Sequence, residues 1–102
     1  MQTEFNTEAY VRLVAAAIEG RMIAYSDVAP RRVVGTYLYR IADYEKAHRR
    51  PPLTALVVHK HDGRPGEGFA IAMKQVGYSR PGESVDELWR RALADVFAYW
   101  RP

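Results

Sequence analysis

The stretch from Pro51 to Phe69, PPLTALVVHKHDGRPGEGF, restricts the possible folds of this chain more than any other. Two adjacent prolines end any helix before them, because proline forces the preceding residue out of the helical region. A mainly apolar run with the β-branched pair Val57 and Val58 follows, which predicts a strand over Leu53–His59 that is buried on both faces. The Asp62-Gly63 pair is a strong signal for a tight turn. Residues 60–68 are therefore expected to form an exposed loop after a core strand.

Amphipathic helices are predicted on both sides of this stretch. Residues 7–19 have helical apolar spacing, with Asn6 or Thr7 as the cap and Gly20 as the stop. Residues 31–48 indicate a long helix, and the Ser84-x-x-Glu87 capping box predicts a last helix. The expected apolar stripes are Tyr10, Leu13, Val14, Ala17 and Ile18; Val34, Tyr37, Leu38, Ile41, Tyr44 and His48; and Leu88, Trp89, Ala92, Leu93, Val96, Phe97, Tyr99 and Trp100.

The remaining short segments complete the predicted order. Residues 21–25 indicate a strand, Ser26 caps one helical turn before Pro30, and residues 69–76 favour a short helix. This order matches that of a winged helix-turn-helix, which has a brief helix, a sharp turn, a longer helix and then a strand with a projecting loop. We therefore expect a small α+β domain of winged helix-turn-helix type with N- and C-terminal packing helices. The length of 102 residues fits a single domain over residues 1–102.

Composition excludes several classes of function. The sequence contains no cysteine, which excludes disulfides and thiol nucleophiles. Its first residues lack the basic and apolar pattern of a signal peptide, and no apolar stretch is long enough to span a bilayer. The sequence therefore predicts a cytoplasmic protein without membrane contact.

The distribution of charge is more informative than the net charge of +3. Residues 31–50 contain six Lys or Arg and two acids, and residues 51–82 contain four and two. The first thirty and last twenty residues are net acidic. A basic centre between acidic ends is typical of a nucleic-acid-binding module, although a solvated basic helix face gives the same pattern.

Several motifs, taken in order, resemble the C-terminal winged-helix domain of methylguanine-DNA alkyltransferases and alkyltransferase-like proteins. They are GRMIAYSDVA at Gly20–Ala29, RVVG from Arg32, a proline-led apolar strand, and DGRPGEGF at Asp62–Phe69. The resemblance covers about half of the chain. It implies a winged helix that binds duplex DNA.

The resemblance also implies roles for two residues. Tyr25 matches the tyrosine that presses on the DNA backbone beside a flipped nucleotide, and Arg32 matches the arginine that enters the duplex in its place. The family's catalytic Pro-Cys-His-Arg is replaced here by PLTA, Pro52–Ala55. Without the cysteine, alkyl transfer to a thiol is excluded.

Other patterns that carry chemistry are weak. His59 and His61 share a strand face, and with Asp62 they suggest a zinc site, but the nearest further ligands are His48 and Glu67. The glycine-rich loop lacks the lysine of a phosphate-binding P-loop. The paired carboxylates lie in a turn or at a helix start, where acids simply favour the helix dipole. We expect no metal, no cofactor and no enzymatic activity, with an enzyme built on the histidine loop as a remote alternative.

The sequence therefore predicts a non-catalytic duplex-DNA-binding protein, a regulator or accessory of a DNA-processing system. The alternative is a small protein-interaction module, such as a phage or defence-related inhibitor or adaptor, that docks through Tyr99 and Trp100 of the C-terminal aromatic helix. These two residues could equally form a homodimer contact. The expected DNA-binding residues are Tyr25, Arg31, Arg32, Thr36, Arg40, Arg49, Arg50, Lys60 and Arg64.

Overall fold

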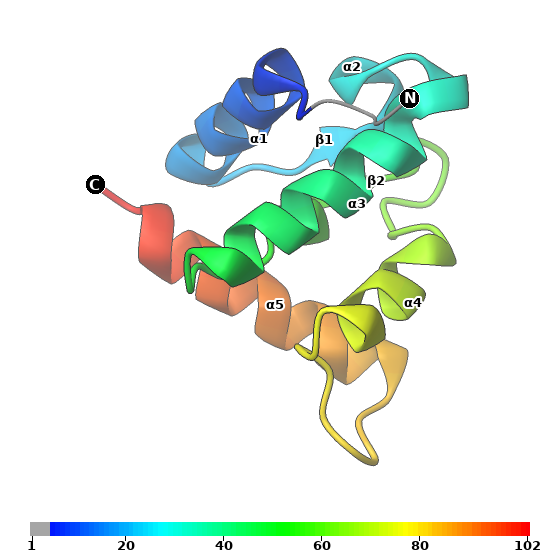
Figure 1. Cartoon of the computed structure of the whole chain (residues 1–102), viewed down its shortest axis with the longest axis vertical. Helices are drawn as coiled ribbons and strands as arrows, with labels where there is room; N and C mark the ends of the chain where they lie inside the picture. The colour runs from blue at the N-terminus through cyan, green and yellow to red at the C-terminus, as the bar shows by residue number, and fades with distance from the viewer. Residues whose placement is uncertain (1–4) are drawn as a thin grey trace.

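The computed structural model describes residues 5–102, and within them the chain is mostly helical with a small sheet. In Figure 1, α3 crosses the front of the molecule, with α1 on one side and α4 and α5 on the other. The described part of the chain is thus an α+β fold. Its elements are α1 (Thr7–Glu19), β1 (Ile23–Ala24), α2 (Tyr25–Val28), α3 (Arg31–Ala47), the 3-10 turn η1 (Leu53–Leu56), β2 (Val57–Val58), α4 (Gly68–Gln75) and α5 (Val85–Trp100).

The sheet consists of β1 and β2, which run parallel with Ile23 opposite Val57 and Ala24 opposite Val58. The prediction of a strand over Leu53–His59 is wrong for its first half, because residues 53–56 form η1. Its burial is confirmed, since every residue from 53 to 58 is buried. The predicted strand over residues 21–25 shortens to β1, because Tyr25 already begins α2. Ser26 therefore lies inside α2 and does not cap it.

The predicted helix ends are confirmed at three places. The Asn6 side chain accepts a hydrogen bond from the Ala9 N–H at 2.8 Å, and Gly20 ends α1 in the left-handed region with φ 71°. Ser84 and Glu87 form the reciprocal capping box at the start of α5. These local signals fix where α1 and α5 lie along the chain, and therefore which of their faces can turn inward.

Two apolar clusters form the core on either side of the η1–β2 segment. The first joins α1, α3, η1 and the C-terminal half of α5, and it contains Leu13, Ile41 and Leu56. The second joins α3, α4 and the N-terminal half of α5 around Met73. The Trp89 indole N–H donates to the Ala55 carbonyl at 2.9 Å, which ties α5 to η1. The predicted apolar stripes are wrong at four residues, which are exposed: Ile18, Tyr44, His48 and Tyr99.

The buried carboxylate of Glu45 on α3 bonds both to α1 and to the segment after α3. The Glu45 side chain is completely buried, accepts a hydrogen bond from the Tyr10 hydroxyl at 2.8 Å, and pairs with the Arg50 guanidinium at 3.0 Å. Burial, together with the Glu45 carboxylate, raises the pKa of Tyr10 to about 12, so that its hydroxyl remains a donor. Arg50 was predicted to bind DNA, but its guanidinium instead pairs with the buried Glu45 carboxylate.

Candidate functional site

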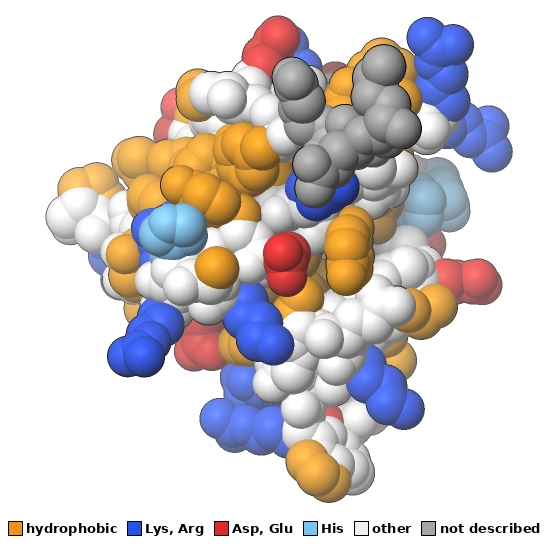
Figure 2. Space-filling view, in the orientation of Figure 1, with side chains coloured by type: hydrophobic (Ala, Val, Ile, Leu, Met, Phe, Trp, Pro, Cys, Tyr) orange, Lys and Arg blue, Asp and Glu red, His pale blue; other side chains and the backbone are white. Residues whose placement is uncertain are grey.

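The exposed face of α3 carries basic side chains that are not neutralised within the protein. Four basic residues of α3 have no ion-pair partner among residues 5–102: Arg31, Arg32, Arg40 and Lys46. By contrast, six arginines of other segments are ion-paired: Arg12, Arg21, Arg50, Arg64, Arg90 and Arg91. Figure 2 looks onto the face that α3 crosses in Figure 1, and it shows separate groups of Lys and Arg side chains on this face, with an acidic side chain near its centre.

The N-terminal end of α3 adds to this positive potential. Pro30 provides neither an N–H nor a side-chain cap, and the first turn contains no acid. Within residues 5–102, the N–H groups of Arg31 and Arg32 have no hydrogen-bond acceptor. Uncapped N–H groups and the helix dipole attract anions at this end, and two guanidinium groups lie beside them.

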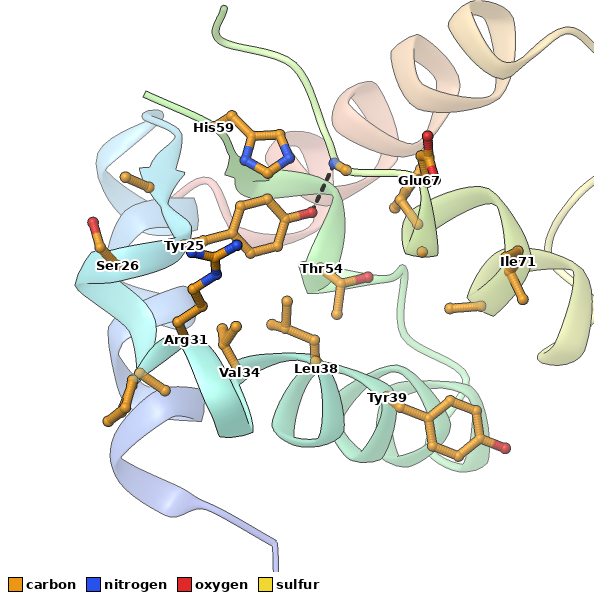
Figure 3. A pocket seen from close by; sticks show the side chains of 18 of the residues that line it. Tyr25, Ser26, Arg31, Val34, Leu38, Tyr39, Thr54, His59, Glu67 and Ile71 are labelled. Carbon is orange, nitrogen blue, oxygen red and sulfur yellow. Dashed lines mark hydrogen bonds between the residues drawn. The ribbon is translucent and has the colours of Figure 1, made fainter. Parts of the chain in front are cut away.

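A cavity of about 1030 Å³ opens beside α3. Its walls are the apolar side of α3, the start of α2, the loop of residues 59–67 and helix α4, as Figure 3 shows. Most of the lining is apolar, with a few polar groups among it, which is the usual character of a ligand site. Its principal side chains are Tyr25, Arg31, Val34, Leu38, Tyr39, Thr54, His59, Lys60, Glu67, Phe69, Ile71 and Gln75.

Tyr25 connects α2 to the loop across one end of this cavity. Its hydroxyl oxygen accepts the Gly66 N–H at 2.8 Å, drawn as the dashed line in Figure 3, and its ring lies 4.8 Å from that of His59. A Cβ at position 66 would come within 3.0 Å of the Tyr25 oxygen and 3.1 Å of His59 Nε2. Glycine at this position therefore permits the close approach of loop and tyrosine.

Thr54 is the buried polar residue of this site. It retains 7% of its surface, and its hydroxyl has no hydrogen-bond partner among residues 5–102. Figure 3 shows its side chain projecting from η1 into the space between α3 and α4. Thr54 is not among the site residues predicted from the sequence. The available signal was its position as the one polar residue in the apolar run Leu53–Val58.

The structure separates the remaining predicted DNA-binding residues. Thr36 is exposed on α3, and Lys60 is exposed at the edge of the cavity. Arg49 lies after the C-terminal end of α3, in the left-handed region with φ 57°. The Arg64 guanidinium pairs with Asp86 at 3.1 Å and lies over the Trp89 ring at 5.5 Å. Arg64 thus holds the loop against α5.

The histidine loop does not assemble a metal site. The His59 and His61 rings stack 5.3 Å apart, and His61 lies 3.4 Å from Asp62. Residues 5–102 contain no group of three or more His, Asp or Glu side chains arranged to hold a metal ion. The Asp86 carboxylate is occupied by Arg64 and Arg90.

The predicted partner-binding residues differ in exposure. Tyr99 is 53% exposed, whereas Trp100 is half-buried and packs against the first core cluster. Their rings lie 5.1 Å apart. An aromatic contact with a partner would therefore depend mainly on Tyr99.

Comparison of the chain with known protein families, curated proteins and solved structures gives no match. None of the helices in residues 5–102 combines the length and apolar character needed to cross a membrane.

Proposed function

We propose that this chain binds duplex DNA without catalysing a reaction on it, as a regulator or accessory of a DNA-processing system. The observation that carries this proposal is the grouping of unpaired basic residues on α3. On the other described helices, three of the four basic residues are ion-paired, namely Arg12, Arg90 and Arg91. Phosphate contacts from arginine and lysine supply most non-specific DNA affinity. Cations without internal partners are free to make them.

In this proposal α3 is the recognition helix of a winged helix-turn-helix, and α2 is the short helix before it. Gly35 and Thr36 are small and exposed, so the helix can approach the edges of bases in a groove. Arg31 and Arg32, at the N-terminal turn, contact phosphate or base. Arg40 lies farther along the helix, and Lys60 contacts the backbone from the loop.

The loop of residues 59–67 acts as the wing. In the described chain it leads into α4 and not into a returning strand. Because Arg64 is held by Asp86, the contribution of this loop to binding rests on Lys60. Arg49 and Arg50 are left out of the interface, since Arg49 follows the far end of α3 and Arg50 pairs with Glu45.

The cavity adds a place for one nucleotide rotated out of the duplex. The resemblance to alkyltransferase-like proteins implies that Tyr25 and Arg32 lie beside such a nucleotide. Proteins that rotate a base out of the stack receive it in a pocket. Tyr25 lines the cavity between α3 and α4, and so does Arg31, the neighbour of Arg32 in the sequence.

Replacement of Arg32 by alanine is expected to weaken duplex binding by ~1–3 kcal/mol, the typical cost of losing an arginine that reads a base. Arg32 is exposed and has no ion-pair partner in residues 5–102, so folding should be unaffected. Fluorescence anisotropy with a labelled random-sequence duplex measures the affinity, and circular dichroism checks the fold.

Arg90→Ala is the matched control, because it removes the same charge from an exposed, ion-paired arginine on α5. It should change duplex affinity far less than Arg32→Ala. Equal losses in the two variants would mean that only net charge matters, and would remove Arg32 from the interface.

A second candidate function is docking on another protein through Tyr99, which the large exposed area of this aromatic residue favours. Such a complex would be governed by apolar burial and would survive high salt. DNA binding, by contrast, weakens steeply as salt is added.

A further inference from the structure

We propose that the cavity beside α3 binds a carboxylic acid with an extended apolar chain, and that Arg31 holds the carboxylate of this ligand. The site goes beyond the proposed function, because the ligand is a small molecule and its binding does not require DNA. The lining of the cavity combines apolar walls with an unpaired arginine at one end.

The wall formed by α3 is long and straight. Arg31, Gly35 and Tyr39 line the cavity at intervals of four residues, so they lie on one face of the helix. At a rise of about 1.5 Å per residue, this face extends ~12 Å from Arg31 to Tyr39. That distance is close to the length of extended decanoate. An elongated chain therefore matches this wall better than a compact ring does.

Apolar side chains at the end of the cavity away from Arg31 are open to water. Tyr39 of α3 and Ile71 of α4 both line the cavity, yet they are 45% and 61% exposed. Figure 3 shows both at this end, and Leu38 and Phe69 continue the apolar lining. Covering apolar surface that would otherwise face water is favourable. An alkyl chain in the cavity would cover these side chains.

The end of the cavity at Arg31 is positively charged. Arg31 and Lys60 line the cavity, and neither has an ion-pair partner in residues 5–102. A guanidinium group pairs with a carboxylate through two parallel hydrogen bonds. Glu67, the acid of the lining, extends from the start of α4, across the cavity from Arg31 (Figure 3). Its charge repels an anion on the α4 side, so the carboxylate is directed to Arg31 and the chain to Ile71.

Gly35 provides a way to close the cavity without damaging the fold. A Cβ at this position would meet no atom within 4 Å outside its own stretch of helix. Gly35→Leu therefore introduces a side chain on the cavity wall without a clash, and leucine favours a helix more than glycine does. Thr36→Leu is the matched control, because Thr36 is the next residue of α3 and lies outside the lining.

The test measures the affinity of the full chain for decanoate, octanoate and 1-octanol by NMR titration, below the concentrations at which the acids form micelles. Wild-type protein should bind decanoate more tightly than octanoate, by about fourfold for each additional buried CH₂. Arg31→Ala should lower octanoate affinity ~10- to 100-fold, the range for hydrogen bonds to a charged group. It should leave 1-octanol affinity unchanged, because this ligand has the same chain and no charge.

The controls decide whether the ligand lies in this cavity. G35L should lose decanoate binding while T36L keeps it, and circular dichroism checks that both variants are folded. Arg32→Ala should bind octanoate as the wild type does, since Arg32 does not line the cavity. Equal decanoate affinity in G35L and T36L would overturn the proposal. So would equal losses of octanoate affinity in R31A and R32A.

Anisotropy of a labelled duplex, recorded with and without decanoate, separates this site from the proposed function. Decanoate binding by a chain that binds no duplex would support the site and contradict the proposed function. Duplex binding without decanoate binding would do the reverse. In a chain that binds both, saturating decanoate should weaken duplex binding, because the acid occupies Arg31. An unchanged duplex affinity would contradict the role of Arg31 in holding the carboxylate.

Discussion

Replacement of Glu45 by alanine is expected to lower the free energy of unfolding by ~3–5 kcal/mol, the usual cost of removing one partner of a buried ion pair. The Glu45 carboxylate is fully buried and receives hydrogen bonds from Tyr10 of α1 and from Arg50. Without it, the Arg50 guanidinium, 19% exposed, stays in the interior without a counter-charge, and the Tyr10 hydroxyl loses its acceptor.

Asp43→Ala is the control for this experiment, because Asp43 is an exposed acid two residues earlier on the same helix. Urea unfolding followed by circular dichroism gives both free energies. Asp43→Ala should stay within about 0.5 kcal/mol of the wild type, as surface substitutions usually do. If Glu45→Ala lost no more than the control, Glu45 would not join α1 to α3.

Replacement of Leu56 by alanine is expected to cost ~2–5 kcal/mol, the range for leucine truncation in a packed core. Leu56 is completely buried in the first cluster, at the point where η1 meets β2. The η1 segment contacts α1, α3 and α5, so a cavity there has little freedom to collapse.

The comparison for Leu56 is Ile71→Ala on α4, where the side chain is 61% exposed. Both changes remove a branched aliphatic group, but only the first removes buried area. Urea unfolding should therefore separate the two variants by more than 1.4 kcal/mol, about tenfold in the folding equilibrium. Equal losses would contradict the central position of η1.

Much of the fold could be predicted because its determinants are local. The caps at Asn6, Gly20 and Ser84 each act within one helical turn, and the structure confirms them. The burial of residues 53–58 also followed from composition. Their conformation did not, because an apolar run is buried equally well as a strand or a 3-10 turn. Only the position of β1, far away in the sequence, limits the pairing to Val57 and Val58.

The site was harder to predict because it depends on pairings between distant residues. Arg50 and Arg64 count as basic residues in the sequence, but Glu45 and Asp86 occupy them in the fold. The unpaired Thr54 hydroxyl could not be predicted either, because its lack of a hydrogen-bond partner depends on where residues distant in the sequence lie. Arg31 and Arg32 are exposed and Arg40 is half-buried on the same helix. They remain in the proposed interface because none of the three has an ion-pair partner in residues 5–102.

The most direct test of DNA binding is the dependence of duplex affinity on salt. Affinity falls with salt by a slope of about −0.9 for each phosphate neutralised, so contacts from Arg31, Arg32, Arg40 and Lys60 predict a loss of about 10²-fold between about 50 and 200 mM salt. The double variant Arg31→Ala/Arg32→Ala should reduce that slope by about two. A chain that binds no duplex at the lower salt concentration, or whose slope is the same in this double variant, would contradict the account.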